Sequence, residues 1–102
     1  MNTTIKEEEG KMIALFSGRF DTLAAVQAAK DVQCVIDSDC KEVELDCQEL
    51  EYISSSGLRI FISILKSVKA RKGTVIVKNI NDEIKKVFEM TGFNKLFIIK
   101  WW

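Results

Sequence analysis

Val43-Glu44-Leu45-Asp46-Cys47, with the residues that follow it as far as position 70, decides the fold of this chain. The five residues alternate apolar and acidic side chains, which is the period of a β-strand with one buried face. From Leu58 onward apolar residues recur at intervals of three and four, which is typical of a helix packed on a sheet. The expected stripe is Leu58, Phe61, Ile62, Leu65 and Val68. The stretch therefore predicts a strand followed closely by a helix.

The corner between them reads Tyr52-Ile53-Ser54-Ser55-Ser56-Gly57. Ser54 or Ser55 can cap the helix, because a serine hydroxyl accepts a hydrogen bond from a first-turn N–H. Gly57 allows a close backbone approach because it has no Cβ. Capping is the simpler explanation of the three serines. The alternative is a phosphorylation switch, because a helix N-terminus offers N–H groups that can hold a phosphate.

The residues before this stretch carry signals for a hairpin and a helix. Residues 3–8 and 11–17 are expected to be strands, and Gly10 supplies the positive φ that a tight turn between them needs. The second strand is apolar on both sides, which indicates an interior position in the sheet. Asp21 or Thr22 then caps a helix that ends near residues 37–39. Its expected inward positions are Ala25, Ala28, Ala29, Val32 and Ile36.

The C-terminal part continues the alternation of helix and strand. Gly73 ends the helix that follows the serines, and Thr74–Lys78 is a β-branched strand. Asn81 caps a short helix that Gly92 closes, with Ile84, Val87 and Phe88 facing inward. Residues 96–99 form a last strand or edge segment. Trp101 and Trp102 either close over a hydrophobic margin or contact another chain, and the first arrangement is commoner.

The element order β-β-α-β-α-β-α-β predicts the fold class. We expect one α/β domain over residues 1–102, with a mixed sheet of four to five strands. Right-handed crossovers between parallel strands place consecutive helices mainly on one face of such a sheet.

Composition excludes several classes of function. The 102 residues hold 15 basic and 15 acidic side chains, so no net field favours nucleic acid or an anionic membrane. No apolar run is long enough to span a membrane, and the first ten residues do not resemble a secretory signal, so we expect a cytoplasmic protein. The absence of histidine excludes a Ser-His-Asp hydrolase. We expect no enzyme activity, no cofactor and no metal site.

Other candidate sites have simpler explanations. Cys34, Cys40 and Cys47 lack the spacing of a zinc or redox site, and we interpret them as reduced structural thiols. Asp21 and Asp46 fall where loops gather in an α/β sheet and could form a carboxylate pair, although capping and solvation explain them as well. The stretch 18–20 lacks the further glycines of a phosphate loop. A contact patch of Met90 and Phe93 competes with simple packing of a helix end.

Taken together, these motifs resemble the STAS domain of the anti-sigma factor antagonist type, over essentially the whole chain. The resemblance is carried by Gly18-Arg19-Phe20-Asp21, Val43-Glu44-Leu45-Asp46, Ile53-Ser54-Ser55-Ser56-Gly57-Leu58 and Thr91-Gly92-Phe93. It implies that Ser56, immediately before the glycine, is the phosphoacceptor. It also implies that Asp21 lies close to that serine, and that the partner-binding or site-forming residues are Asp21, Ser54, Ser55, Gly57 and Leu58. Ser54 stands where the family has an aspartate, which keeps a cap but removes a charge.

The resemblance also implies partners and a mechanism. The partners would be an anti-sigma factor that is a serine kinase with a histidine-kinase-like ATP-binding fold, and a metal-dependent serine phosphatase. The unmodified antagonist captures the kinase and frees the sigma factor, and the phosphorylated form lets go. The alternative function is a constitutive STAS scaffold or subunit, for example of a lipid-transport assembly. Ser56 before Gly57 favours the switch, and serine in place of aspartate at position 54 leaves room for the scaffold.

Overall fold

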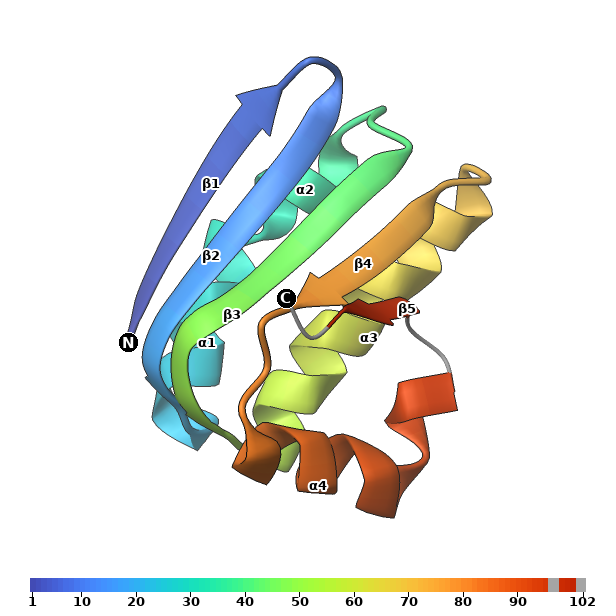
Figure 1. The fold of residues 1–102 in the computed structure, drawn as a ribbon. Coiled ribbons are helices and arrows are strands. Elements are labelled where there is room, and N and C mark those ends of the chain that lie inside the picture. The colour runs from blue at the N-terminus through green and yellow to red at the C-terminus, as the bar shows by residue number, and fades with distance from the viewer. Residues whose placement is uncertain (96–97, 101–102) are drawn as a thin grey trace.

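The structure is a computed structural model that describes residues 1–95 and 98–100, and its strands form one five-stranded sheet (Figure 1). The elements, in chain order, are β1 (Asn2–Glu8), β2 (Lys11–Phe20), α1 (Thr22–Asp31), α2 (Gln33–Asp37), β3 (Glu42–Ile53), α3 (Ser55–Ala70), β4 (Thr74–Lys78), α4 (Asp82–Thr91), the 3-10 helix η1 (Phe93–Lys95) and β5 (Ile98–Lys100). The strand order is β1-β2-β3-β4-β5. β1 pairs antiparallel with β2, and the other pairs are parallel.

The predicted fold class is confirmed. In Figure 1, α1, α2 and α3 lie behind the sheet, and α4 lies across the end at which the parallel strands finish. Because each parallel strand is added on the same side of the last, crossovers of one hand keep these helices on one face. β2 is an interior strand, as its apolar character predicted. Within the described part of the chain, no helix is both long and apolar enough to cross a membrane.

The core lies between the sheet and these helices. Val43, Leu45 and Cys47 are fully buried, as their alternation with acidic residues predicted. Beneath the end of β2 the buried phenylalanines form one aromatic cluster, in which ring centroids are 5.2 to 6.3 Å apart. Its members are Phe16, Phe20, Phe61 and Phe88. Tilted and edge-on pairs at such distances are favourable beyond their burial, so the cluster fixes how α3 sits on the sheet.

β3 is longer and less regular than the sequence predicted. Its buried apolar residues follow a period of two from Val43 to Cys47, and then a period of three at Leu50 and Ile53. The pairing with β2 explains the change, because it contains two register shifts that each add one residue to β3. The strand therefore continues through Tyr52 and Ile53, which we had expected to belong to the corner.

The helical segment before β3 also differs from the prediction. It is two helices, because Val32, at φ −89° and ψ −1°, ends α1 and begins α2. Ala29 was expected to face inward but is exposed, whereas Ala25 and Ala28 are buried. Ile36 is half-buried. The buried positions nevertheless keep one helical spacing across the break, because Val32 and Val35 are buried as well, so Ala29 was a wrong position and Val35 was missed.

α3 and α4 agree with the predictions more closely. In α3, Ile64 is fully buried and Ile62 only half-buried, so one position of the predicted stripe is wrong. Asn81 caps α4, and its Oδ1 accepts a hydrogen bond from the N–H of Ile84 at 2.8 Å. Gly92 ends the helix in the left-handed region at φ 77°. Leu96, Phe97 and the two C-terminal tryptophans of the sequence predictions lie outside the described residues.

Arg71, the residue after α3, ties the end of that helix to α2. Its guanidinium donates to the backbone oxygens of Cys40 at 2.7 Å and of Ile36 and Val35 at 3.1 Å each. It also donates to Ser38 Oγ at 3.2 Å. These carbonyls lie at and just beyond the C-terminal end of α2, where no further turn of helix is present to bond them. Arg71 therefore supplies a donor to the Ile36 and Cys40 oxygens and adds to the donors that Ser38 already gives the Val35 oxygen.

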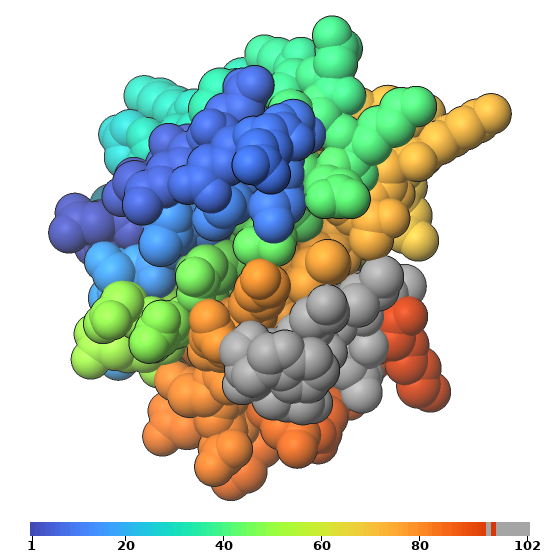
Figure 2. Space-filling model, turned by 45° about the horizontal axis from the view of Figure 1, so that its top comes forward, coloured from blue at the N-terminus to red at the C-terminus, as the bar shows by residue number. Residues whose placement is uncertain are grey.

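The face of the sheet opposite these helices is seen in Figure 2 across the blue, green and orange atoms of β1 to β4. It includes one buried carboxylate among the described residues, on the middle strand β3. Glu44 is 7% exposed, and its Oε1 accepts from Lys11 Nζ at 2.9 Å and Lys78 Nζ at 3.1 Å. Burial by itself would raise the pKa of the Glu44 carboxyl, but the two lysines outweigh it and the pKa is lowered. Glu44 thus stays ionised between two cations on this face.

Candidate functional site

The corner predicted from the serines is held at the end of the sheet where β2 and β3 finish. We define the corner as Asp21 and residues 54–58. The N–H of Ser54 donates to the carbonyl of Phe20 at 2.8 Å, which ties the end of β3 to the end of β2. Asp21 follows Phe20 directly, so α1 and α3 begin beside each other. The corner is therefore held by a backbone hydrogen bond, and its side chains are available for capping or for binding.

Two side chains of the corner are helix caps. Ser54 is the N-cap of α3, and its Oγ accepts from the N–H of Gly57 at 3.1 Å. Asp21 is the N-cap of α1, and its Oδ1 accepts from the N–H of Ala24 at 2.8 Å. Of the alternatives left by the sequence, Ser54 rather than Ser55 caps α3, and Asp21 rather than Thr22 caps α1. Each cap satisfies one of the amides that a helix start leaves without a partner.

Gly57 makes the close approach that its position in the sequence suggested. A Cβ at this position would lie 2.8 Å from Ile53 Cγ1 and 2.9 Å from Phe20 Cδ1. Real Cβ atoms do not approach other atoms so closely, so a larger residue would push the first turn of α3 off the sheet. Leu58, the next residue, is buried at 3% exposure. Gly57 and Leu58 thus hold the start of α3 against the core.

Ser55 and Ser56 remain as the side chains of the corner without a structural task. Ser55 is exposed and Ser56 is half-buried, and neither hydroxyl has a hydrogen-bond partner among the described residues. In the first turn, the N–H of Gly57 bonds Ser54 Oγ and the N–H of Leu58 bonds the Ser54 carbonyl. The N–H groups of Ser55 and Ser56 have no acceptor within residues 1–95 and 98–100. Two amides at the positive end of a helix are thus open to an anion.

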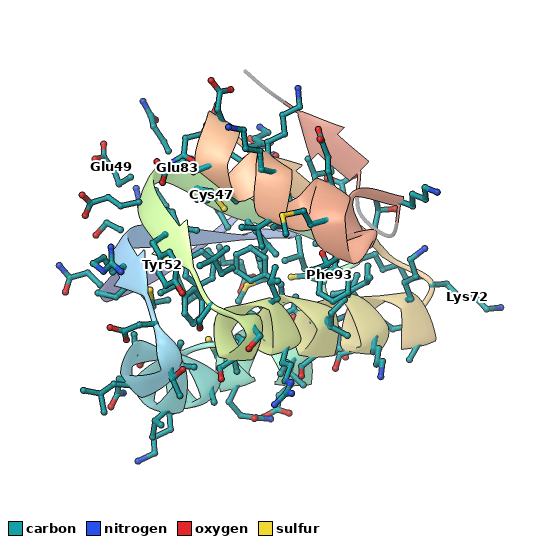
Figure 3. The ribbon with its side chains drawn as sticks, turned by 90° about the horizontal axis from the view of Figure 1, so that it is seen from below. Cys47, Glu49, Tyr52, Lys72, Glu83 and Phe93 are labelled. Carbon is teal, nitrogen blue, oxygen red and sulfur yellow. The ribbon has the colours of Figure 1, made fainter. Side chains whose placement is uncertain are left out.

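Two features beside the corner were not found from the sequence. The guanidinium carbon of Arg19 lies 4.5 Å from the ring centroid of Tyr52, a cation–π contact between the C-terminal ends of β2 and β3. Figure 3, which looks onto this end of the sheet, places Tyr52 at the junction of β3 with α3. Leu23 and Val26 of α1 are 82% and 62% exposed, on the side of the helix opposite Ala25 and Ala28. The sequence signal that could have identified them is a pair of aliphatic residues three apart on the helix side that was not expected to be buried.

The carboxylate-pair alternative is wrong, because the two aspartates lie apart in the sheet. Asp46 pairs with Leu15 in the middle of β3, whereas Asp21 lies beyond the end of β2. Asp46 Oδ1 accepts from Asn79 Nδ2 at 3.2 Å and from the N–H of Gln48 at 3.1 Å. Within the described residues, no three Cys, Asp or Glu side chains gather as they would around a metal ion.

The structure shows the state and the burial of each cysteine. All three cysteines are free thiols: Cys34 is exposed, Cys40 half-buried and Cys47 buried. Burial raises the pKa of the Cys47 thiol above its usual range, and the nearby Asp46 carboxylate adds to the effect.

Met90 is 86% exposed, but Phe93 packs against the core between α4 and α3 (Figure 3). Met90 and Phe93 therefore do not form one exposed patch.

Known proteins share both the sequence pattern and the fold. The model of the STAS domain matches residues 2–101. BtrV of Bordetella bronchiseptica, provisionally named an anti-sigma factor antagonist, is 29% identical over 97 residues, covering 95% of this chain and 84% of BtrV. An anti-sigma factor antagonist of Mycobacterium paratuberculosis has a similar crystal structure, with a TM-score of 0.87 and 19% identity over 97% of this chain and 84% of that one.

A further structure with the same fold was solved in a modified state. It is the Bacillus cell fate determinant SpoIIAA in its phosphorylated form, with a TM-score of 0.75 and 17% identity over 96% of this chain and 90% of that one. The family model covers nearly the whole of the sequence, and the structural matches extend over the same elements. This chain belongs to the STAS domain family.

Proposed function

We propose that this protein is an anti-sigma factor antagonist that is switched by phosphorylation of Ser56. Unphosphorylated, it binds an anti-sigma factor that is also a serine kinase, and the sigma factor is released. Phosphorylated, it lets the kinase go, and a metal-dependent serine phosphatase restores the binding form. The names of the similar proteins support the antagonist role, and the phosphorylated form of SpoIIAA supports the switch.

The observation that carries the proposal is the state of the Ser56 hydroxyl. It is half-buried, lacks a hydrogen-bond partner in the described part of the chain, and sits on the first turn of α3 beside two open amides. In the proposed reaction, Ser56 Oγ attacks the γ-phosphorus of a kinase-bound nucleoside triphosphate. The new O–P bond forms as the bond to the leaving diphosphate breaks, and a base or solvent takes the hydroxyl proton.

The fold tolerates the product better than a docked partner would. An anion at the N-terminus of a helix is stabilised by roughly 0.3–1 kcal/mol. A protein surface docked on the corner would have to bury the same group, which carries about −1.5 to −2 charges. Leaving such a charge buried without a partner costs about 3–5 kcal/mol, or at least a hundredfold in affinity. Phosphorylation would therefore break the complex while leaving the domain folded.

The neighbouring surface suits a protein partner. Leu23 and Val26 lie on the exposed side of α1, which starts beside α3, and Arg19 and Tyr52 lie between the two strand ends. Apolar side chains of this size on one surface are commonly buried in protein contacts. We therefore include Leu23 and Val26 in the proposed partner-binding surface, with Asp21 and residues 54–58.

Mass spectrometry after incubation with the cognate kinase and ATP tests the acceptor, and titration calorimetry with the kinase tests the switch. We expect phosphate on Ser56, tight binding of Ser56→Ala, and binding of Ser56→Asp at least tenfold weaker. Lys66→Gln is the control, because it changes the net charge equally on an exposed site of α3 about 15 Å further along. Leu23→Ser should weaken binding without altering the circular dichroism spectrum.

The scaffold alternative makes the opposite prediction. It is favoured by Ser54, a neutral cap where the family has an aspartate, because α3 then has no acidic residue in its first turn. A constitutive scaffold would carry no phosphate after incubation with kinase and ATP. It would also bind its partner equally well as Ser56→Ala and Ser56→Asp. Either result, or phosphate only on Ser54 or Ser55, would overturn the proposal.

A further inference from the structure

Arg59 is the basic residue nearest to the proposed acceptor on the same helix. It follows Ser56 by three positions in α3, so the two side chains are neighbours on the helix surface. Side chains in a helix lean toward its N-terminus, and the Arg59 side chain is therefore directed toward the turn that contains Ser56. Arg59 is exposed. Its long side chain can reach a group on Ser56 Oγ without any change in the backbone.

The Arg59 guanidinium is uncommitted in the unmodified protein. It has no hydrogen bond or ion pair to any residue in the ranges 1–95 and 98–100. α3 contains no aspartate or glutamate, so no carboxylate on the same helix competes for it. Of the other charged groups at the corner, Arg19 lies over Tyr52 and Asp21 accepts from the amide of Ala24. Both are occupied by contacts of their own.

The start of α3 also lacks the negative charge that a helix start favours. α4 carries Asp82 and Glu83 in its first turn, which complement the positive end of its dipole. α3 has three serines there and then Arg59, a cation near the positive end. This arrangement is unfavourable in the unmodified protein, and a phosphate on Ser56 would reverse it. Arg59, a cation without a counter-ion among the described residues, thus lies three residues from Ser56, where a negative charge would be favourable.

We propose that Arg59 is the internal counter-ion of phosphorylated Ser56. The proposal rests on Ser56 being the acceptor, as proposed above. Before phosphorylation, the guanidinium is presented at the corner and is available to a carboxylate of the partner. After phosphorylation, it forms charge-assisted hydrogen bonds to the phosphate of its own helix. Phosphorylation thus adds an anion to the surface and at the same time withdraws a cation from the partner.

The test installs phosphoserine at position 56 during synthesis of the full chain, so that no kinase is needed. Phosphorus-31 NMR then follows the second ionisation of the phosphate in the parent protein and in three variants. Arg59→Gln should make the phosphate titrate roughly half a pH unit higher, because an exposed cation next to it favours the dianion. Lys66→Gln, which removes a cation from the same helix two turns further on, should leave the titration unchanged, and so should Arg19→Gln.

Thermal melting supplies a second readout. Phosphoserine at position 56 should raise the melting temperature of the parent protein more than that of Arg59→Gln. Equal titration in the parent and Arg59→Gln would overturn the proposal, and so would an equal upward shift in Arg59→Gln and Lys66→Gln, or a shift with Arg19→Gln alone. These results do not depend on which residue a kinase modifies. Failure of the kinase to modify Ser56 would instead reject the proposed function.

Discussion

Replacing Arg71 by alanine should destabilise the protein without touching the Ser56 corner. Arg71 bonds the carbonyls of Cys40, Ile36 and Val35 and the hydroxyl of Ser38. The Val35 oxygen keeps other donors, since the N–H and the Oγ of Ser38 bond it at 3.3 and 2.9 Å. The Cys40 and Ile36 oxygens lose the donor that Arg71 supplies. The loss therefore concerns two part-buried carbonyls rather than all four acceptors.

The magnitude follows from those two carbonyls. A hydrogen bond to a charged donor contributes about 1.5–3 kcal/mol when buried, and partial exposure at this site reduces that to roughly 1–1.5 each. Arg71→Ala should thus lower the free energy of unfolding by about 2–3 kcal/mol. For a domain of this size, the melting temperature should fall by about 10–15 °C. Arg71→Lys keeps the charge but cannot reach oxygens in three directions, and it should recover about half of the loss.

Urea unfolding followed by circular dichroism at pH 7 measures these differences. Lys69→Ala is the matched control, because Lys69 is an exposed cation in the last turn of the same helix. It should cost less than about 0.5 kcal/mol. If Arg71→Ala were as stable as Lys69→Ala, the carbonyls would not depend on Arg71. If Arg71→Lys matched the parent protein, charge alone rather than the planar set of donors would explain the effect.

Three further predictions concern other parts of the molecule. Gly57→Ala should lower the unfolding free energy by up to about 2 kcal/mol, because overpacking against Ile53 and Phe20 outweighs a gain of about 1 kcal/mol in helix propensity; a variant as stable as the parent in urea would contradict the close approach. Glu44→Gln should cost about 1 kcal/mol at pH 7. Because the folded pKa of Glu44 is lowered, this contribution is full above the unfolded pKa of about 4.3 and is lost as the pH falls through the folded pKa. If the difference in unfolding free energy between the parent protein and Glu44→Gln were the same at pH 3 as at pH 7, the pairing with Lys11 and Lys78 would be contradicted. A thiol reagent should modify Cys34 in the native protein but Cys47 only after unfolding, and equal rates would contradict the burial of Cys47.

The parts of the fold that the sequence predicted well depend on a few consecutive residues. The caps at Asp21, Ser54 and Asn81 and the left-handed stop at Gly92 each follow from local backbone chemistry. The same holds for Gly57, whose lack of a Cβ was visible before the atoms it approaches were known. The geometry of the corner was predictable for this reason. Ser56 as the acceptor stays a prediction, because no local geometry distinguishes a modified hydroxyl from an unmodified one.

The parts that the sequence did not predict depend on residues far apart in the chain. The two extra residues of β3 are defined only by its register with β2, so the alternation that ends at Cys47 wrongly suggested that the strand ends there. The hydrogen bonds of Arg71 are of this kind, because its acceptors lie 31 to 36 positions earlier in the chain. The contact of Arg19 with Tyr52 also joins two strands. The spacing of apolar residues along the sequence carries no information on which distant residues pair.

The strand order has a consequence for how the chain can assemble. Every strand pairs with the strands that precede and follow it in the sequence, so no later segment has to be inserted between two strands that are already paired. During synthesis, each helix and strand that emerges can dock on the edge left by the previous one, from β1 to β5. Such growth keeps the loops that must close short relative to the chain, which favours rapid folding. At each stage the unfinished edge belongs to the most recently docked strand, and Ser54 can bond the Phe20 carbonyl without β4, because that contact joins only the ends of β2 and β3.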